Sequence, residues 1–192
     1  MLNDRSTPLA LLETRRSGKP REMIAPGPDA EQLQEILRVA ARTPDHGKLF
    51  PWRFVIVADA ARPALALRLG EILQVEKADC TARDVEAAAQ FATQAPALVV
   101  VLSAPIAGHK IPLWEQELSA GAVCMNLLHA AHALGFVASW ITGWAAYSPA
   151  VRDLFGRDGE RIAGFLFVGT PMRDLEERPR PLLSEIAQVW NP

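Results

Sequence analysis

HKIPLWEQELSAGAVCMNLLHAAHALGF, residues 109–136, is the stretch of the chain that bears most on its fold. Its central run, Leu118–Leu134, is apolar on nearly every side at helical spacing, and Gly135 stands where helices commonly end. A helix of this kind must be covered all round, and one small sheet cannot do that. We therefore expect a second copy of the chain to cover the remainder, which predicts a homodimer.

This central run is not expected to cross a membrane. It is too short for a bilayer and carries Asn126, His129 and His132, which would be costly at hydrocarbon depth. The two histidines are interpreted as core residues of a buried helix. The N-terminus lacks the features of a signal peptide, and Cys80 and Cys124 share no CxxC spacing, so we expect reduced thiols in a cytoplasmic protein.

The composition describes an ordinary globular chain of 192 residues with a formal net charge of -2. That charge, with no stripe of lysine and arginine, gives no footprint for nucleic acid. We expect a single domain over residues 1–192, whose Pro- and Arg-rich tail from about residue 170 ends in apolar side chains suited to wrap a partner subunit.

Helices and strands alternate along the chain, which leaves the class open between α/β and α+β. Aromatic, β-branched or continuously apolar runs predict four strands, at Trp52–Ala58, Ala97–Ser103, Val137–Thr142 and Ile162–Val168. Caps and apolar spacing predict helices from Pro8 towards Arg15, from Asp29 to Arg42, over Arg62–Gln94 with a break near Asp79 and Thr81, and over Ala150–Phe155. The stretch from Gly18 to Pro28 is predicted to be a loop.

Two clusters suit a phosphorylated cofactor, although neither a GxGxxG fingerprint nor a P-loop is present. Arg15, Arg16 and Ser17 offer two guanidinium forks and a hydroxyl to a phosphate, or are simply cations at a helix C-terminus. The loop from Arg42 to Trp52 combines cations, an imidazole (His46) and an aromatic ring, or is a surface turn.

The segment His109–Gly121 carries Glu115 and Glu117 where the long helix begins, as the helix dipole favours. A metal site on His46, His109 and Glu117 is an alternative, but the HExxH spacing and the cysteine pairs of zinc sites are missing, so no metal is expected. Cys124 is interpreted as a small buried hydrophobe.

Taken together, four blocks of this chain resemble the nitroreductase family, in particular its compact bacterial NAD(P)H nitroreductases. In chain order the blocks are Arg15-Arg16-Ser17, Arg42 to Trp52, His109 through Phe136, and Gly164 through Pro171. The third block is the most specific because it is long and of unusual composition, and the four together span nearly the whole chain.

The resemblance implies an α+β, three-layer nitroreductase-like fold with a central, mostly antiparallel sheet flanked by helices. It also implies an intertwined homodimer with FMN at the subunit interface. Within one subunit, FMN would be bound by Arg15, Arg16 and Ser17. The same flavin would be lined by a segment after the long helix, Trp140, Ile141 and Thr142. Arg42 and His46 would reach the flavin of the other subunit.

Relatives often carry an arginine where this chain has Ile141, and Arg173 or Arg180 of the tail would supply the missing charge. The implied reaction is ping-pong hydride transfer from NAD(P)H through flavin N5 to a small acceptor such as a nitroaromatic or a quinone. No side chain is expected to act as a nucleophile or an obligatory general acid. Two alternatives remain open: a flavin-binding sensor or storage protein without turnover, and a metal-dependent hydrolase.

Overall fold

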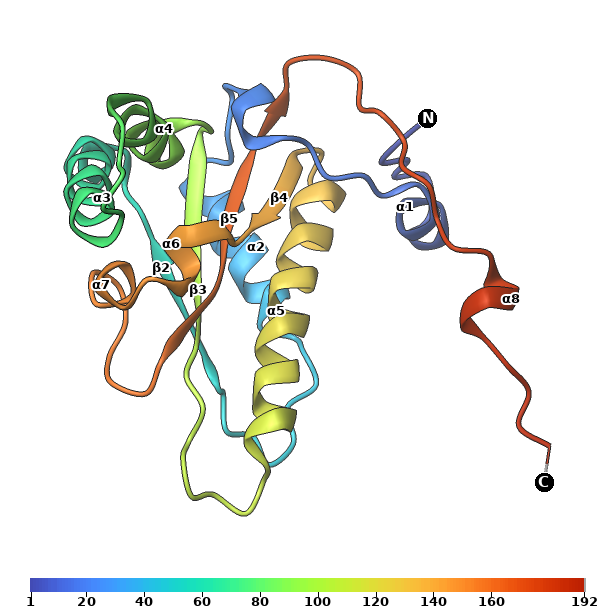
Figure 1. Ribbon diagram of the computed structural model, residues 1–192. Coiled ribbons are helices and arrows are strands. Elements are labelled where there is room, and N and C mark those ends of the chain that lie inside the picture. Colours follow the sequence, from blue (N-terminus) through green and yellow to red (C-terminus); the bar gives the residue numbers. More distant parts are fainter. Residues whose placement is uncertain (192) are drawn as a thin grey trace.

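A computed structural model describes residues 1–191 and shows an α+β architecture around one five-stranded sheet (Figure 1). Every strand pairing in it is antiparallel. The strand order is β1-β5-β3-β2, and β4 also pairs with β5. The strands are β1 (Met23–Ile24), β2 (Trp52–Ile56), β3 (Ala97–Ser103), β4 (Val137–Ile141) and β5 (Arg161–Pro171).

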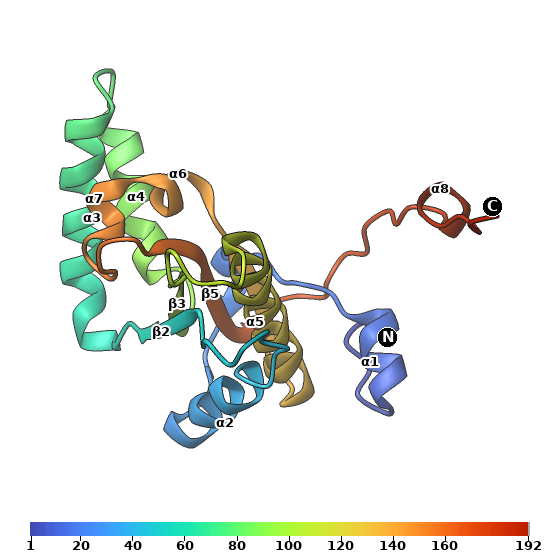
Figure 2. The same cartoon turned by 90° about the horizontal axis from the view of Figure 1, so that it is seen from below.

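Helices cover both faces of this sheet and make three layers (Figures 1 and 2). One face carries α2 (Ala30–Ala40) and α5 (Leu113–Ala133), and the other carries α3 (Arg62–Glu76) and α4 (Ala82–Thr93). Alternate residues of β3 belong to the two resulting cores: Val100 packs on the α3–α4 side and Val99 on the α5 side. All of β3 is buried, as its continuous apolar run predicts, and the predicted three-layer fold is confirmed.

Local signals start and stop the helices as expected. The Asp29 side chain and Gln32 form a capping box at α2, and the Thr81 hydroxyl caps α4 after the predicted break. Thr7 caps α1 (Pro8–Thr14), and Gly135 takes a φ of +94° directly beyond α5. Cys124 is fully buried, as expected, and its desolvation raises the pKa of the thiol to about 12.

Several boundaries differ from the sequence expectation, because pairing across the fold decides them. Met23–Ile24, predicted as loop, forms β1 against Thr170 and Pro171, which also lengthens β5 beyond Val168. The helix predicted over Ala150–Phe155 is the shorter α7 (Pro149–Arg152). The helix before it, α6 (Gly143–Tyr147), was not predicted. The short helices η1 (Pro20–Glu22), η2 (Asp59–Ala61) and α8 (Leu183–Ile186) complete the elements.

The tail beyond β5 runs away from the body of the molecule and carries α8 (Figure 1). Its apolar side chains are exposed in the single chain: Leu182, Leu183, Ile186, Val189 and Trp190. Among residues 1–191, none of the helices combines the length and the apolarity that crossing a membrane requires.

Candidate functional site

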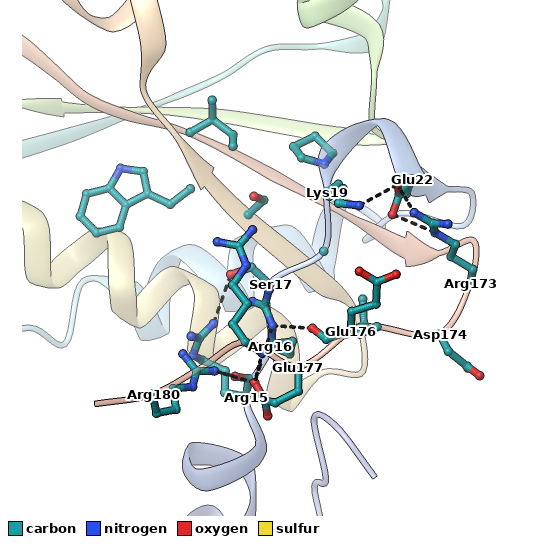
Figure 3. A pocket seen from close by; sticks show the side chains of 17 residues that line it. Arg15, Arg16, Ser17, Lys19, Glu22, Arg173, Asp174, Glu176, Glu177 and Arg180 are labelled. Carbon is teal, nitrogen blue, oxygen red and sulfur yellow. Dashed lines mark hydrogen bonds and ion pairs between the residues drawn. The ribbon is translucent and has the colours of Figure 1, made fainter. Parts of the chain in front are cut away.

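A cavity of about 420 Å³ is lined by more cationic side chains, most of them arginines, than carboxylates (Figure 3). We call it the arginine cavity. Three segments that are distant in sequence build it: the turn after α1, the end of β4 and the first part of the tail. Its lining includes Arg15, Arg16, Ser17, Gly18, Lys19, Glu22, Ser139, Trp140, Ile141, Arg173, Asp174, Glu176, Glu177, Arg178 and Arg180.

The turn after α1 is held in place by backbone contacts. The Arg16 amide donates to Asn3 Oδ1 at 2.7 Å, and Asn3 Nδ2 donates to the Arg16 carbonyl at 3.1 Å. Gly18 lies so close to β4 that a Cβ there would be 2.8 Å from Val137 Cγ2, a distance at which something must shift. Glycine at this position therefore lets the Arg15–Ser17 turn approach the start of β4.

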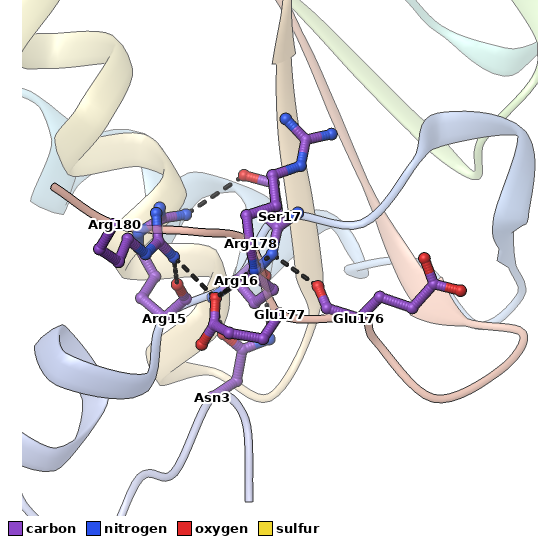
Figure 4. A network of polar contacts seen from close by, with 8 residues as sticks. All are labelled: Asn3, Arg15, Arg16, Ser17, Glu176, Glu177, Arg178 and Arg180. Carbon is purple, nitrogen blue, oxygen red and sulfur yellow. Dashed lines mark hydrogen bonds and ion pairs between the residues drawn. The ribbon is translucent and has the colours of Figure 1, made fainter.

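The arginines of the turn have different partners (Figure 4). Arg15 Nη1 donates to Ser17 Oγ at 3.2 Å, whereas Arg16 Nε donates to the Glu176 carbonyl at 2.8 Å. The Glu177 carboxylate lies 3.8 Å from Arg16 Nε and also accepts from Arg180 Nη2 at 3.1 Å. Arg16 thus fastens the tail, and Arg15 is left facing Ser17.

Crowding of cations and burial lower the pKa of two of these arginines. For Arg15 the main cause is burial, followed by the charges of Arg180 and Arg16. For Arg16 it is again burial, followed by Arg178 and Arg180. Both guanidiniums stay protonated at neutral pH, so the cavity holds positive charge that an anion would stabilise. A phosphate group has the charge and the acceptor oxygens that this donor set fits.

The end of β4 forms the apolar wall of the arginine cavity. Trp140 and Ile141 line it, and the indole Nε1 of Trp140 donates to the Ala163 carbonyl at 2.9 Å. Thr142 lies beyond this wall and instead lines an apolar cavity of about 750 Å³ beside α3 and α4. Ile141 lines both cavities.

Arg42 and His46 do not line the arginine cavity of their own chain, and they contact α5 at two separate positions. His46 Nδ1 is 2.6 Å from Glu115 Oε2, and the Arg42 carbonyl faces Asn126 Nδ2 at 3.5 Å. Glu115 is in the first turn of α5, whereas Asn126 lies eleven residues further along, about 16 Å at 1.5 Å per helical residue.

Sequence reasoning anticipated only part of this cavity. Arg173 and Arg180, named as compensating charges, do line it. Lys19, two residues after Ser17, was missed. Glu176, Glu177 and Arg178 were also missed, because no local pattern marks a tail that folds back on a turn more than a hundred residues earlier in the sequence.

The residues proposed for a metal-dependent hydrolase do not come together. His46 pairs with Glu115, His109 Nδ1 accepts from the Ile111 amide, and Glu117 pairs with Arg161. Within residues 1–191, no three His, Cys, Asp or Glu side chains gather as metal ligands would. The structure thus gives the hydrolase alternative no support.

Comparison with known structures places the fold. The Nitroreductase-like Family Protein from Bacillus cereus superposes with a TM-score of 0.83 over 96% of both chains, at 21% identity. Oxidized iodotyrosine deiodinase, solved with FMN and 3-iodo-L-tyrosine, superposes with a TM-score of 0.68 over 96% of this chain and 98% of its own, at 22% identity. The fold is therefore that of the nitroreductase-like proteins.

Sequence comparison then identifies the family. The Nitroreductase family model matches residues 12–170. The "Putative NAD(P)H nitroreductase YdjA" of Escherichia coli K12 is 39% identical over 164 residues, 85% of this chain and 87% of that protein. A "Putative NAD(P)H nitroreductase" of Haemophilus influenzae is 36% identical over 174 residues, 90% of this chain and 92% of its own length. The chain belongs to the nitroreductase family and is an oxidoreductase.

Proposed function

We propose that this protein binds FMN and uses NAD(P)H to reduce a small organic acceptor, such as a nitroaromatic or a quinone. One observation carries the proposal: the surplus of guanidinium groups around Arg15–Ser17 lies directly beside the apolar wall of Trp140 and Ile141. A cofactor with a phosphate at one end and a planar ring at the other needs these two surfaces side by side.

The roles of the residues follow from their chemistry. Arg15, Arg16 and Ser17 would hold the phosphate, because guanidinium and hydroxyl groups donate charge-assisted hydrogen bonds to it. Trp140 and Ile141 would border the ring and keep water from it, whereas Thr142 lines the neighbouring cavity beside α3 and α4 and is not assigned to the ring. Bound FMN would supply the redox chemistry, passing a hydride from NAD(P)H to the acceptor through N5 in a ping-pong cycle. No side chain is proposed as a nucleophile or an obligatory general acid.

We further propose that the whole chain, residues 1–192, is one domain that works as an intertwined homodimer. Exposed or half-buried positions of α5 recur at helical spacing at Trp114, Leu118, Ala122 and Met125, and Leu118 is 53% exposed. A second copy on this face would cover it. Arg42 and His46, which do not line the arginine cavity of their own chain, would then border that of the partner, and the apolar tail would wrap around it.

The test uses the purified full-length chain. We expect it to be yellow or to take up FMN, and NADH or NADPH to bleach the flavin absorbance. Steady oxidation of NAD(P)H by a quinone or a nitroaromatic would then establish turnover. Bleaching without turnover would favour the flavin sensor or store, and a protein that stays colourless in excess FMN would refute the proposal.

A further inference from the structure

One carboxylate of the arginine cavity lies against the arginines themselves (Figure 4). Glu177 Oε1 is 3.8 Å from Arg16 Nε and accepts a hydrogen bond from Arg180 Nη2 at 3.1 Å. Burial lowers the pKa of Arg15 and of Arg16, and the negative charge of Glu177 acts in the opposite direction on both. A single carboxylate on the tail thus interacts with three guanidinium groups.

Two other carboxylates of the cavity are placed differently. Glu22 pairs with Lys19 and Arg173 in a separate group (Figure 3). Glu176 precedes Glu177 in the chain, but its carboxylate points away from the arginines of the turn, and its backbone carbonyl is the group that accepts from that turn (Figure 4). Neighbouring carboxylates of the tail therefore differ in their relation to the guanidiniums.

The Glu177 side chain can leave its position without releasing the tail. It is 53% exposed, and ion pairs of exposed side chains contribute little to stability. Its Oε1 also accepts from the Arg178 amide at 2.8 Å, a contact with the next residue that water can replace. The tail stays attached through the Glu176 carbonyl, which holds Arg16 independently of the Glu177 carboxylate.

A phosphate is a stronger ligand for these guanidiniums than a carboxylate is. It carries more negative charge and has three acceptor oxygens, so it accepts more charge-assisted hydrogen bonds. An incoming phosphate and the Glu177 carboxylate would require the same donors. The phosphate would therefore displace the carboxylate rather than bind beside it.

We propose that Glu177 is an internal competitor of phosphate in the arginine cavity. Before a phosphate binds, the carboxylate offsets the repulsion between Arg15, Arg16 and Arg180; when a phosphate binds, the carboxylate moves into solvent. Glu177 thus stabilises the cavity without a ligand and lowers its affinity for phosphate. The extension to FMN rests on the proposed function, whereas competition with inorganic phosphate does not.

Calorimetry of the full-length protein with inorganic phosphate tests the competition. Glu177→Gln should bind phosphate about fivefold more tightly, because it keeps the size of the side chain and removes its charge. Glu176→Gln is the matched control: it removes the same charge one residue earlier and should change the affinity less than about twofold. An unchanged affinity in Glu177→Gln, or an equal gain in both variants, would overturn the proposal.

Urea denaturation gives a second measurement, which a purely structural role of Glu177 would not reproduce. Without phosphate, Glu177→Gln should unfold at a lower urea concentration than the wild type, because the guanidiniums then repel one another with no carboxylate between them. Phosphate should raise the midpoint of this variant more than that of the wild type. A variant that is less stable and also binds phosphate more weakly would overturn the proposal.

The same variants separate this proposal from the proposed function. Glu177→Gln should also bind FMN about fivefold more tightly, whereas its affinity for riboflavin, which lacks the phosphate, should equal that of the wild type. The expected gain for phosphate in a protein that takes up no FMN would retain the role of Glu177 and refute the flavoenzyme. FMN uptake and turnover with no gain in Glu177→Gln would do the reverse.

Discussion

Arg15 and Arg16 are neighbours in sequence with different roles in the structure. Arg16 is 8% exposed and donates to the tail backbone, so it belongs to the packing of the tail as much as to the cavity. Arg15 touches only Ser17 through its guanidinium. A test of phosphate binding is therefore cleaner at Arg15, where loss of the side chain leaves the tail attached.

We predict that Arg15→Ala weakens FMN binding roughly tenfold to a hundredfold, as expected for the loss of one or two charge-assisted hydrogen bonds to phosphate. Fluorescence titration of apoprotein with FMN measures the change. Arg21→Ala, an exposed arginine that does not line the cavity, serves as the matched control and should bind as the wild type does. Equal affinity in the two variants would exclude Arg15 from the phosphate site.

His132 gives a pH prediction. It is fully buried and its Nε2 accepts from the Ala138 amide at 3.2 Å. Burial, with smaller effects of the Arg15 and His129 charges, lowers its pKa from 6.5 to about 3. The unfolded chain binds this proton below about pH 6.5 and the folded chain does not, so the stabilisation is complete above that pH and is lost as the pH falls towards 3.

Between pH 7 and 5.5, the free energy of unfolding should therefore decrease with falling pH, with His132 contributing a slope of up to about 1.4 kcal/mol per pH unit. Urea denaturation across this range measures the slope. His132→Gln should lower stability at neutral pH and flatten the curve. An unchanged slope in this variant would show that the imidazole becomes protonated in the folded protein.

At the scale of elements, Arg62 joins two helices. It is the first residue of α3, is 5% exposed, and donates to the carbonyls of Val57, Ala92, Ala95 and Pro96. Ala92 is in the last turn of α4, so the guanidinium supplies donors to carbonyls that the end of that helix leaves free. The sequence gives no sign of this role, since an arginine at a helix start resembles an ordinary surface residue.

We predict that Arg62→Lys destabilises the fold by about 2–4 kcal/mol, because one ammonium cannot replace a planar fork that serves four carbonyls. Thermal and urea unfolding measure the loss. Arg68→Lys is the control on the same helix: it is exposed and pairs only with Glu71, so it should cost less than about 0.5 kcal/mol. Similar losses in both variants would contradict the assigned role.

At the scale of the whole molecule, the assembly decides whether the proposed site is complete. We predict that Leu118→Glu, which places a charge on the uncovered face of α5, shifts the protein from dimer to monomer in sedimentation experiments. The matched control is Leu67→Glu, because Leu67 is 64% exposed on α3, across the sheet from α5 (Figure 1). A wild-type protein that sediments as a single chain would refute the dimer.

The Leu118→Glu monomer should also bind FMN more weakly, since Arg42 and His46 of a partner would no longer border the arginine cavity. Titration of the monomer with FMN checks this. Undiminished affinity would show that one chain holds the cofactor alone and would remove Arg42 and His46 from the proposed site.

By itself, the sequence determined those features of the fold that depend only on residues close to one another in the chain. Apolar spacing predicted the long helix, the cap at Asp29 marked a helix start, and the apolar run at Ala97–Ser103 predicted the central strand, because each of these signals acts within a few residues. The family resemblance likewise rested on short blocks read in order.

Only the tertiary structure decided what those blocks form together. Met23–Ile24 is a strand because β5 lies beside it, and no propensity of its own predicts that. Arg16 meets the carbonyl of Glu176, 160 residues later, and Trp140 lies over Gly164 because two strands pair. Contacts of this range depend on chain closure and packing of the whole fold, so the arginine cavity leaves no local pattern in the sequence.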